Sequence, residues 1–142
     1  MGVDDTTDIF NSNLQIIQVQ DKDVHEDFED IYDHNIAMLT LVSDVTLRAS
    51  AQVVKLANLF EGGPGSTCTV TGNGIDEGGS KTTKLQVATL STVGLLSCII
   101  TWYRRSEEFK VNKREVCAVS ETATPCTGDN GGPLVCKRPL GA

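Results

Sequence analysis

Short apolar runs separated by glycine-rich and polar turns recur along the chain, and this pattern predicts a protein built mainly from β-strands. Strands are expected at residues 14–20, 36–41, 53–56, 67–71, 84–90, 115–120 and 133–136. Residues 36–41 are almost continuously apolar, which is typical of a strand buried on both faces, and residues 133–136 are also expected to be a buried strand. Glycine-rich turns at 61–66, 72–74 and 76–79 separate several of these segments.

One segment has the periodicity of a helix instead. Apolar side chains recur with the spacing i, i+3, i+4 and i+7 at Leu95, Cys98, Ile99 and Trp102. This spacing predicts a helix over residues 91–103, with Trp102 facing the core. Many short strands and a single helix favour an all-β fold, either an antiparallel barrel or a sandwich.

The length and the net charge of the chain limit the kinds of molecule that we expect it to bind. The 142 residues suffice for one domain, and 12 basic against 19 acidic residues give a net charge of −7. This balance argues against nucleic acid and anionic membranes, which attract clustered Lys and Arg. No apolar run approaches the roughly 20 residues of a membrane-spanning helix, and no signal peptide opens the chain.

Residues 21–33 form an acidic segment that superficially suggests a calcium loop. Asp21, Asp23 and His25 have some of the spacing of an EF-hand. Glu26 stands where the essential glycine belongs, however, and Tyr32 stands where the bidentate Glu belongs, so the EF-hand interpretation fails. A solvated acidic loop is the favoured interpretation, and weak cation binding is the alternative.

Five cysteines lie in the second half of the chain, at positions 68, 98, 117, 126 and 136. They include no C-x-x-C pair, and both histidines lie far upstream, so we expect no metal site, zinc included, and no cofactor. Their clustering favours disulfide bonds formed in an oxidising compartment. The odd count leaves one cysteine without an intramolecular partner.

The segment Cys126–Cys136 concentrates the candidate chemistry. Three glycines surround Asp129 and Asn130, which indicates tight turns able to direct several backbone N–H groups to one point, as an oxyanion hole requires. Asn130, at the centre, carries an amide, which is a very poor nucleophile compared with a serine or cysteine activated by a base. The segment therefore has a catalytic architecture without a reactive atom.

Four segments, in order, resemble the trypsin- and chymotrypsin-like serine proteases. Residues 127–136 resemble the Gly-Asp-Ser-Gly-Gly-Pro-Leu-Val-Cys signature, with Asn130 in place of the nucleophilic serine. Residues 34–39 resemble the Asn-Asp-Ile-Ala-Leu-Leu segment, with Asn35 where the triad aspartate belongs. Residues 68–74 resemble Cys-x-Val-x-Gly-Trp-Gly, with Asn73 replacing Trp, and residues 24–28 are similar to a surface His-Pro-x-Phe segment. His25 is therefore not the catalytic histidine.

The resemblance, which runs from about residue 14 to the end, implies an incomplete trypsin-like double β-barrel. Residues 1 to about 57 would be the end of the first barrel and the connection, and residues 58–142 the second barrel without its C-terminal part. The segment bearing the catalytic histidine would be absent. The implied disulfides are Cys68–Cys136 and Cys98–Cys117, with Cys126 unpaired. We expect such a chain to be marginally stable alone, because deletions of this kind expose strand edges and core surface.

The resemblance also assigns positions around the site. Gly128 and Asn130 would supply the oxyanion-hole N–H groups, and Thr124 would lie at the base of the primary specificity pocket, where it would not select Lys or Arg. Asp129 matches an aspartate that pairs with a new N-terminus after activation cleavage, and no partner for it is evident in this sequence.

The favoured function is a non-catalytic serine-protease homologue, a secreted module that binds proteases, inhibitors or protein substrates without cutting them. The acidic 21–33 segment and the Arg104–Arg105 loop are candidate contact surfaces. One alternative is a damaged or mispredicted copy of an active trypsin-like endopeptidase. The other is a truncated product that has no function as it stands.

Overall fold

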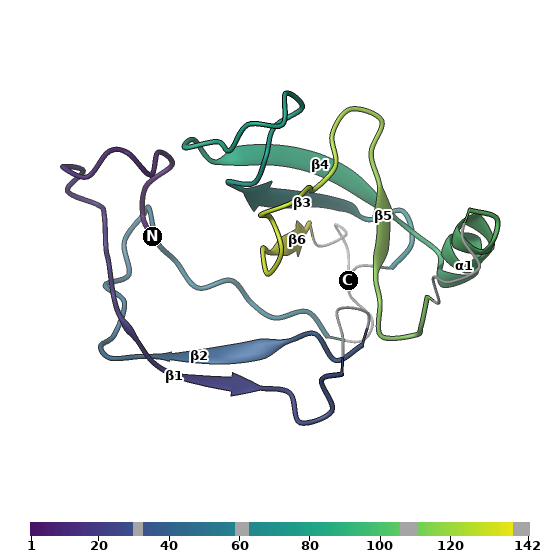
Figure 1. Cartoon of the computed structure of the whole chain (residues 1–142), viewed down its shortest axis with the longest axis horizontal. Helices are drawn as coiled ribbons and strands as arrows, with labels where there is room; N and C mark the ends of the chain where they lie inside the picture. Colours follow the sequence, from purple (N-terminus) through teal and green to yellow (C-terminus); the bar gives the residue numbers. More distant parts are fainter. Residues whose placement is uncertain (30–32, 59–62, 106–110, 138–142) are drawn as a thin grey trace. The chain divides into compact units, whose positions relative to one another are not determined.

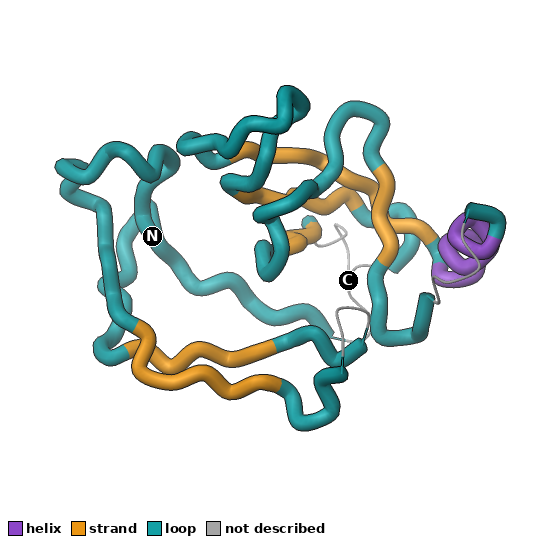
Figure 2. The backbone as a smooth tube through the Cα atoms, in the orientation of Figure 1, coloured by secondary structure: helices purple, strands orange, loops and turns teal. Residues whose placement is uncertain are grey.

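The computed structural model describes residues 1–29, 33–58, 63–105 and 111–137. Its described part contains six strands, all paired antiparallel, and one helix, so the predicted all-β class with a single short helix is confirmed (Figures 1 and 2). The chain divides into two compact units, unit 1 at Met1–Lys55 and unit 2 at Leu56–Ala142. This boundary lies close to residue 57, where the family resemblance places the end of the connection.

Unit 1 contains a two-stranded antiparallel sheet formed by β1 (Val19–Val24) and β2 (Ala37–Leu41). The pairing aligns Val24 with Ala37, and an irregularity in register lies between Val19 and Asp21. The strand predicted at 36–41 is confirmed, but its predicted burial on both faces is wrong, since Met38 is 74% exposed. The acidic segment predicted as a loop begins inside β1, and its residues 30–32 lie outside the described part.

Of two other strand predictions in the first part of the chain, one is only partly correct and one is wrong. Residues 19 and 20 of the segment predicted at 14–20 begin β1, but residues 14–18 form no strand. The backbone groups of Gln15 pair with the N-terminal residue instead: the Gln15 N–H donates to the carbonyl of Met1 at 3.0 Å, and the Gln15 carbonyl accepts the N-terminal ammonium at 2.9 Å. The Gln15 side-chain amide also donates to the carbonyl of Thr46 at 3.0 Å, and its side-chain oxygen accepts the Thr46 N–H at 2.8 Å. Residues 53–56 also form no strand, and Val53 and Leu56 are 80% and 86% exposed.

Unit 2 is built on a four-stranded sheet with the order β5-β4-β3-β6 (Figure 1). Its strands are β3 (Thr67–Gly72), β4 (Gln86–Val93), β5 (Cys117–Val119) and β6 (Leu134–Cys136). These strands confirm the segments predicted at 67–71, 84–90, 115–120 and 133–136. The predicted burial of the last one is wrong, because Leu134 and Val135 are 40% and 42% exposed at the edge of the sheet.

The helix α1 (Leu95–Tyr103) starts later than the periodicity predicts, because residues 91–93 extend β4 and Gly94 is the N-cap. Its apolar face is only partly covered: Cys98 is buried, whereas Trp102 is 39% exposed, so the predicted core position of Trp102 is wrong. Within the described residues, no helix has both the length and the apolar character needed to cross a membrane.

The buried apolar side chains of the described residues are few, and two of them are disulfide-bonded cysteines. Cys68 is 1% exposed, Leu90 5% and Cys98 4%. Cys68 bonds Cys136 on the neighbouring strand β6, and Cys98 of α1 bonds Cys117 of β5. These are the two pairs that the family resemblance implies, and Cys126 is free and exposed. The first disulfide therefore links the edge strand β6 to the core residue Cys68, and the second links the helix α1 to β5.

Thr92 is a buried polar residue that ties β4 to the turn preceding β3. Its hydroxyl donates to the carbonyl of Gly63 at 2.6 Å and accepts the N–H of Ser66 at 2.9 Å. The backbone adds two bonds, from the Thr92 N–H to Ser66 and from the Gly65 N–H to Thr92. One hydroxyl therefore satisfies two backbone groups of this turn.

We expect Thr92→Val to lower the free energy of unfolding by about 1 kcal/mol, because the change keeps the side-chain shape but removes both hydrogen bonds of the hydroxyl. The Ser66 N–H and the Gly63 carbonyl retain the hydrogen bond that they make to each other. The measurement is urea denaturation followed by circular dichroism. Thr89→Val is the matched control, since Thr89 is exposed on the same strand. Equal stabilities of the two variants would contradict the role given to the Thr92 hydroxyl.

Candidate functional site

The glycine-rich loop between β5 and β6 consists of two consecutive turns that share Asp129. The Asp129 N–H donates to the carbonyl of Cys126, and the Gly132 N–H donates to the carbonyl of Asp129, both at 3.0 Å. Each turn has a glycine with positive φ at its third position, +96° at Gly128 and +81° at Gly131. A turn of this type requires positive φ there, a conformation that glycine adopts without steric cost. The sequence thus dictates the shape of the loop.

Asp129 fastens this loop to the end of β3. Its Oδ2 atom accepts the N–H of Cys126 at 2.9 Å, and its Oδ1 atom accepts the N–H of Gly74 at 2.8 Å. The Ile75 N–H adds a bond to the carbonyl of Thr127 at 3.0 Å. The sequence shows no evident partner for Asp129, but in the structure backbone N–H groups of the same unit hold its carboxylate. One of these groups belongs to Gly74, which is far from Asp129 in sequence.

The contact between the loop and β3 is too close for ordinary side chains. A Cβ added to Gly74 would lie 2.6 Å from Oδ1 of Asp129 and 2.7 Å from the carbonyl oxygen of Thr127. A Cβ on Gly132 would lie 3.2 Å from the carbonyl oxygen of Thr71 in β3. Two of the segments that carry the family resemblance, 68–74 and 127–136, are therefore packed backbone against backbone.

Asn130 is the second residue of the second turn and is exposed. Within the described part of the chain, neither its N–H nor that of Gly128 donates a hydrogen bond to a protein acceptor. Two nearby backbone donors with no internal acceptor are what an oxyanion hole needs. The assignment of Gly128 and Asn130 to those positions stays a prediction.

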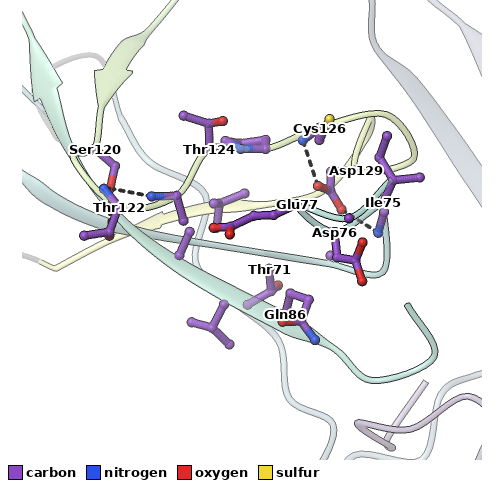
Figure 3. A pocket seen from close by; sticks show the side chains of 18 of the residues that line it. Thr71, Ile75, Asp76, Glu77, Gln86, Ser120, Thr122, Thr124, Cys126 and Asp129 are labelled. Carbon is purple, nitrogen blue, oxygen red and sulfur yellow. Dashed lines mark hydrogen bonds between the residues drawn. The ribbon is translucent and has the colours of Figure 1, made fainter. Parts of the chain in front are cut away.

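A pocket of about 660 Å³ opens beside this loop in unit 2 (Figure 3). β3 and β4 form one wall, and residues 120–126, which include Thr124, form another. The charged side chains among its described lining residues are all acidic: Asp76, Glu77, Glu121 and Asp129. Thr124 is exposed at this pocket, and its assignment as the base of a specificity pocket stays a prediction.

The other predicted positions lie elsewhere. Asn35 lies in unit 1, shortly before β2, and is exposed. Asn73, at the position of the family tryptophan, donates its side-chain amide to the carbonyl of Thr83 at 3.2 Å. Arg104 and Arg105 follow α1 and are exposed, and the rest of their loop, 106–110, is outside the described residues.

The fold is antiparallel β, and the Gly-Asp-Asn-Gly-Gly-Pro loop is hydrogen-bonded to the end of the Cys-Thr-Val-Thr-Gly-Asn-Gly strand. Together these features indicate a class of protein, the trypsin-like serine proteases. The family described as Trypsin matches residues 2–141, and the chain belongs to this family.

Individual relatives agree with this assignment. The chain is similar to Trypsin iota of Drosophila melanogaster, with 36% identity over 118 residues, which cover 82% of this chain and 46% of that protein. It is also similar to Transmembrane protease serine 9 of Rattus norvegicus, with 31% identity over 119 residues, which cover 80% of this chain and 11% of that protein.

A solved structure matches at the level of the fold. Neuropsin, described as a serine protease expressed in the limbic system of mouse brain, superposes with a TM-score of 0.75 and 28% identity, covering 87% of this chain and 56% of that one. This match confirms the predicted trypsin-like fold. The chain spans about half the length, or less, of the proteins it matches.

Proposed function

We propose that this chain is a non-catalytic member of the trypsin family that binds proteins without cleaving them. The observation that carries the proposal is the amide of Asn130, which stands in an intact, exposed glycine loop at the position of the nucleophilic serine. An amide cannot form the acyl intermediate that this chemistry requires. Asn35, at the position of the triad aspartate, would moreover not fix the histidine tautomer that a serine protease needs.

The loop retains its shape without its reactive atom, and this supports a role in recognition. Thr124 itself would not select Lys or Arg, but the described lining of the pocket beside the loop carries four carboxylates and no basic side chain. These carboxylates favour a partner that presents a cationic group. The partner would be a protease, an inhibitor or a protein substrate. We place this binding outside the cell, because two disulfides persist in an oxidising compartment.

We expect the full chain to leave a broad mixture of peptide substrates uncut, because the proposal puts the amides of Asn130 and Asn35 at the positions of the nucleophilic serine and the triad aspartate. The measurement is mass spectrometry of the peptides after prolonged incubation. Asn130→Ser is the matched variant: it restores the hydroxyl without supplying a general base, and it is also expected to be inactive. Cleavage by the unmodified chain would contradict the proposal.

The second candidate is a damaged copy of an active endopeptidase. The free N–H groups of Gly128 and Asn130 favour it, since such donors serve catalysis directly. Peptide cleavage by Asn130→Ser, with none by the unmodified chain, would support this candidate. The third, a product without function, predicts that no protein partner binds either form of the chain.

A further inference from the structure

The hairpin of unit 1 brings both histidines of the chain together. His25 directly follows β1 and His34 precedes β2, and the His25 N–H donates to the carbonyl of Ile36 at 3.1 Å, which continues the strand pairing. The two imidazole rings consequently stack, with centroids 4.6 Å apart and an angle of 28° between their planes. Residues at the two ends of the hairpin connection thus become neighbours.

Asp27 joins this pair through a turn at the end of β1. The Phe28 N–H donates to the carbonyl of His25 at 3.0 Å, and the resulting turn folds the Asp27 carboxylate back toward the rings. One ligand atom from each of His25, Asp27 and His34 then lies within 4.8 Å of the other two. Two imidazoles and a carboxylate converge at one point on the surface of the unit.

We propose that His25, Asp27 and His34 form a binding site for a divalent transition-metal ion, of which zinc is the best fit. Two imidazole nitrogens and one carboxylate oxygen are among the ligand sets that zinc accepts, with water completing the coordination. Mg²⁺ and Ca²⁺ prefer oxygen ligands and fit this set poorly. The site lies in unit 1 and shares no residue with the glycine loop or with the pocket of unit 2.

The surroundings of the rings favour coordination at His34. Its Nδ1 atom lies 3.4 Å from Oδ1 of Asp33, and Nε2 is the ring nitrogen that this carboxylate leaves to a metal. A carboxylate behind a metal-binding imidazole fixes the orientation of the ring. His34 also has φ of +49°, and its backbone N–H donates to the Asp33 side chain at 2.9 Å.

Binding requires a modest rearrangement of His25 and Asp27. Bonds of the length found in zinc sites place tetrahedral ligand atoms about 3.4 Å apart, so ligand atoms that lie up to 4.8 Å from one another must approach by up to about 1.4 Å. The Nδ1 atom of His25 accepts the Asp27 N–H at 3.2 Å, and coordination through this atom replaces that long hydrogen bond. Both side chains are exposed. The spacing of these three residues in the sequence does not reveal the site, because the hairpin, and not a short sequence motif, brings them together.

The test is isothermal titration of the full chain with zinc chloride alone at neutral pH. It is made in a Cys126→Ser background, because the free thiol is itself a zinc ligand. We expect one zinc ion per chain, with binding unaffected by an excess of Mg²⁺ or Ca²⁺. His25→Gln and His34→Asn are each expected to weaken the affinity by about tenfold or more. Asparagine is chosen at His34 because it tolerates positive φ.

Glu26→Gln is the matched control, because Glu26 is an exposed carboxylate of the same turn outside the cluster. It is expected to bind zinc like the parent chain. As a second readout, zinc should shift the imidazole NMR resonances of both histidines in the parent chain, which also shows that the fold is intact. The proposal is overturned if the parent chain binds no zinc, if the histidine variants bind like the parent, or if Glu26→Gln weakens binding equally.

Discussion

Replacement of Asp129 by alanine is expected to lower the free energy of unfolding of unit 2 by about 3–6 kcal/mol. The Asp129 carboxylate accepts two backbone N–H groups, from Gly74 and Cys126, and a hydrogen bond to a charged acceptor contributes about 1.5–3 kcal/mol. Asp129→Asn retains one acceptor oxygen and is expected to cost about half as much. Urea denaturation followed by circular dichroism measures both variants.

Glu77→Gln provides the control for Asp129, since Glu77 lines the same pocket and is exposed. Substitutions at such surface positions usually change stability by less than about 0.5 kcal/mol. If Asp129→Asn is as stable as Glu77→Gln, the carboxylate does not fasten the loop to β3.

The second large effect is expected on removing the disulfide between Cys68 and Cys136. This link closes a loop with a sequence separation of 68, whereas the link between Cys98 and Cys117 closes one of 19. The chain-entropy relation gives about 4 kcal/mol for the longer loop and about 3 kcal/mol for the shorter one. We therefore expect the double variant Cys68→Ala/Cys136→Ala to be the less stable of the two double variants in equilibrium urea denaturation.

Cys126→Ala is the control for both double variants, because Cys126 is free and exposed. It is expected to unfold like the parent chain. A Cys68→Ala/Cys136→Ala chain as stable as this control would show that the link does not support the sheet. Since the buried apolar side chains of the described residues are so few, we consider these disulfides to be the main stabilising contribution to unit 2.

The sequence predicted the fold well where local pattern and sheet structure agree. The β-branched run at Thr67–Gly72 and the apolar segment at Leu134–Cys136 are strands of one sheet, and Gly128 and Gly131 adopt the positive φ that their turns need. The class of fold and the position of the glycine loop could therefore be predicted from residue pattern alone. The loop's identity came from the family resemblance and not from periodicity.

The sequence failed where a distant partner decides the outcome. Nothing local indicates that Gly74 donates to Asp129, or that the hairpin stacks His25 on His34. Residues 14–18 have a strand-like pattern, yet the backbone N–H and carbonyl of Gln15 pair with the N-terminal residue Met1. Such long-range contacts override local propensity.

Burial was the weakest part of the prediction. Apolar periodicity places Trp102 in a core, but periodicity shows only which residues share a face and not whether another element covers that face. In the described residues α1 buries Cys98 alone, through its disulfide with Cys117.

The absence of a reactive nucleophile is the central claim, and labelling with a serine-reactive fluorophosphonate tests it most directly. The full chain is incubated with the reagent beside an active trypsin, and intact mass is recorded for both. We expect an adduct on the trypsin and none on this chain, because the proposed function puts Asn130 at the position of the reactive serine. A stoichiometric adduct that maps to one residue of the folded chain, and is lost on denaturation before labelling, would contradict it.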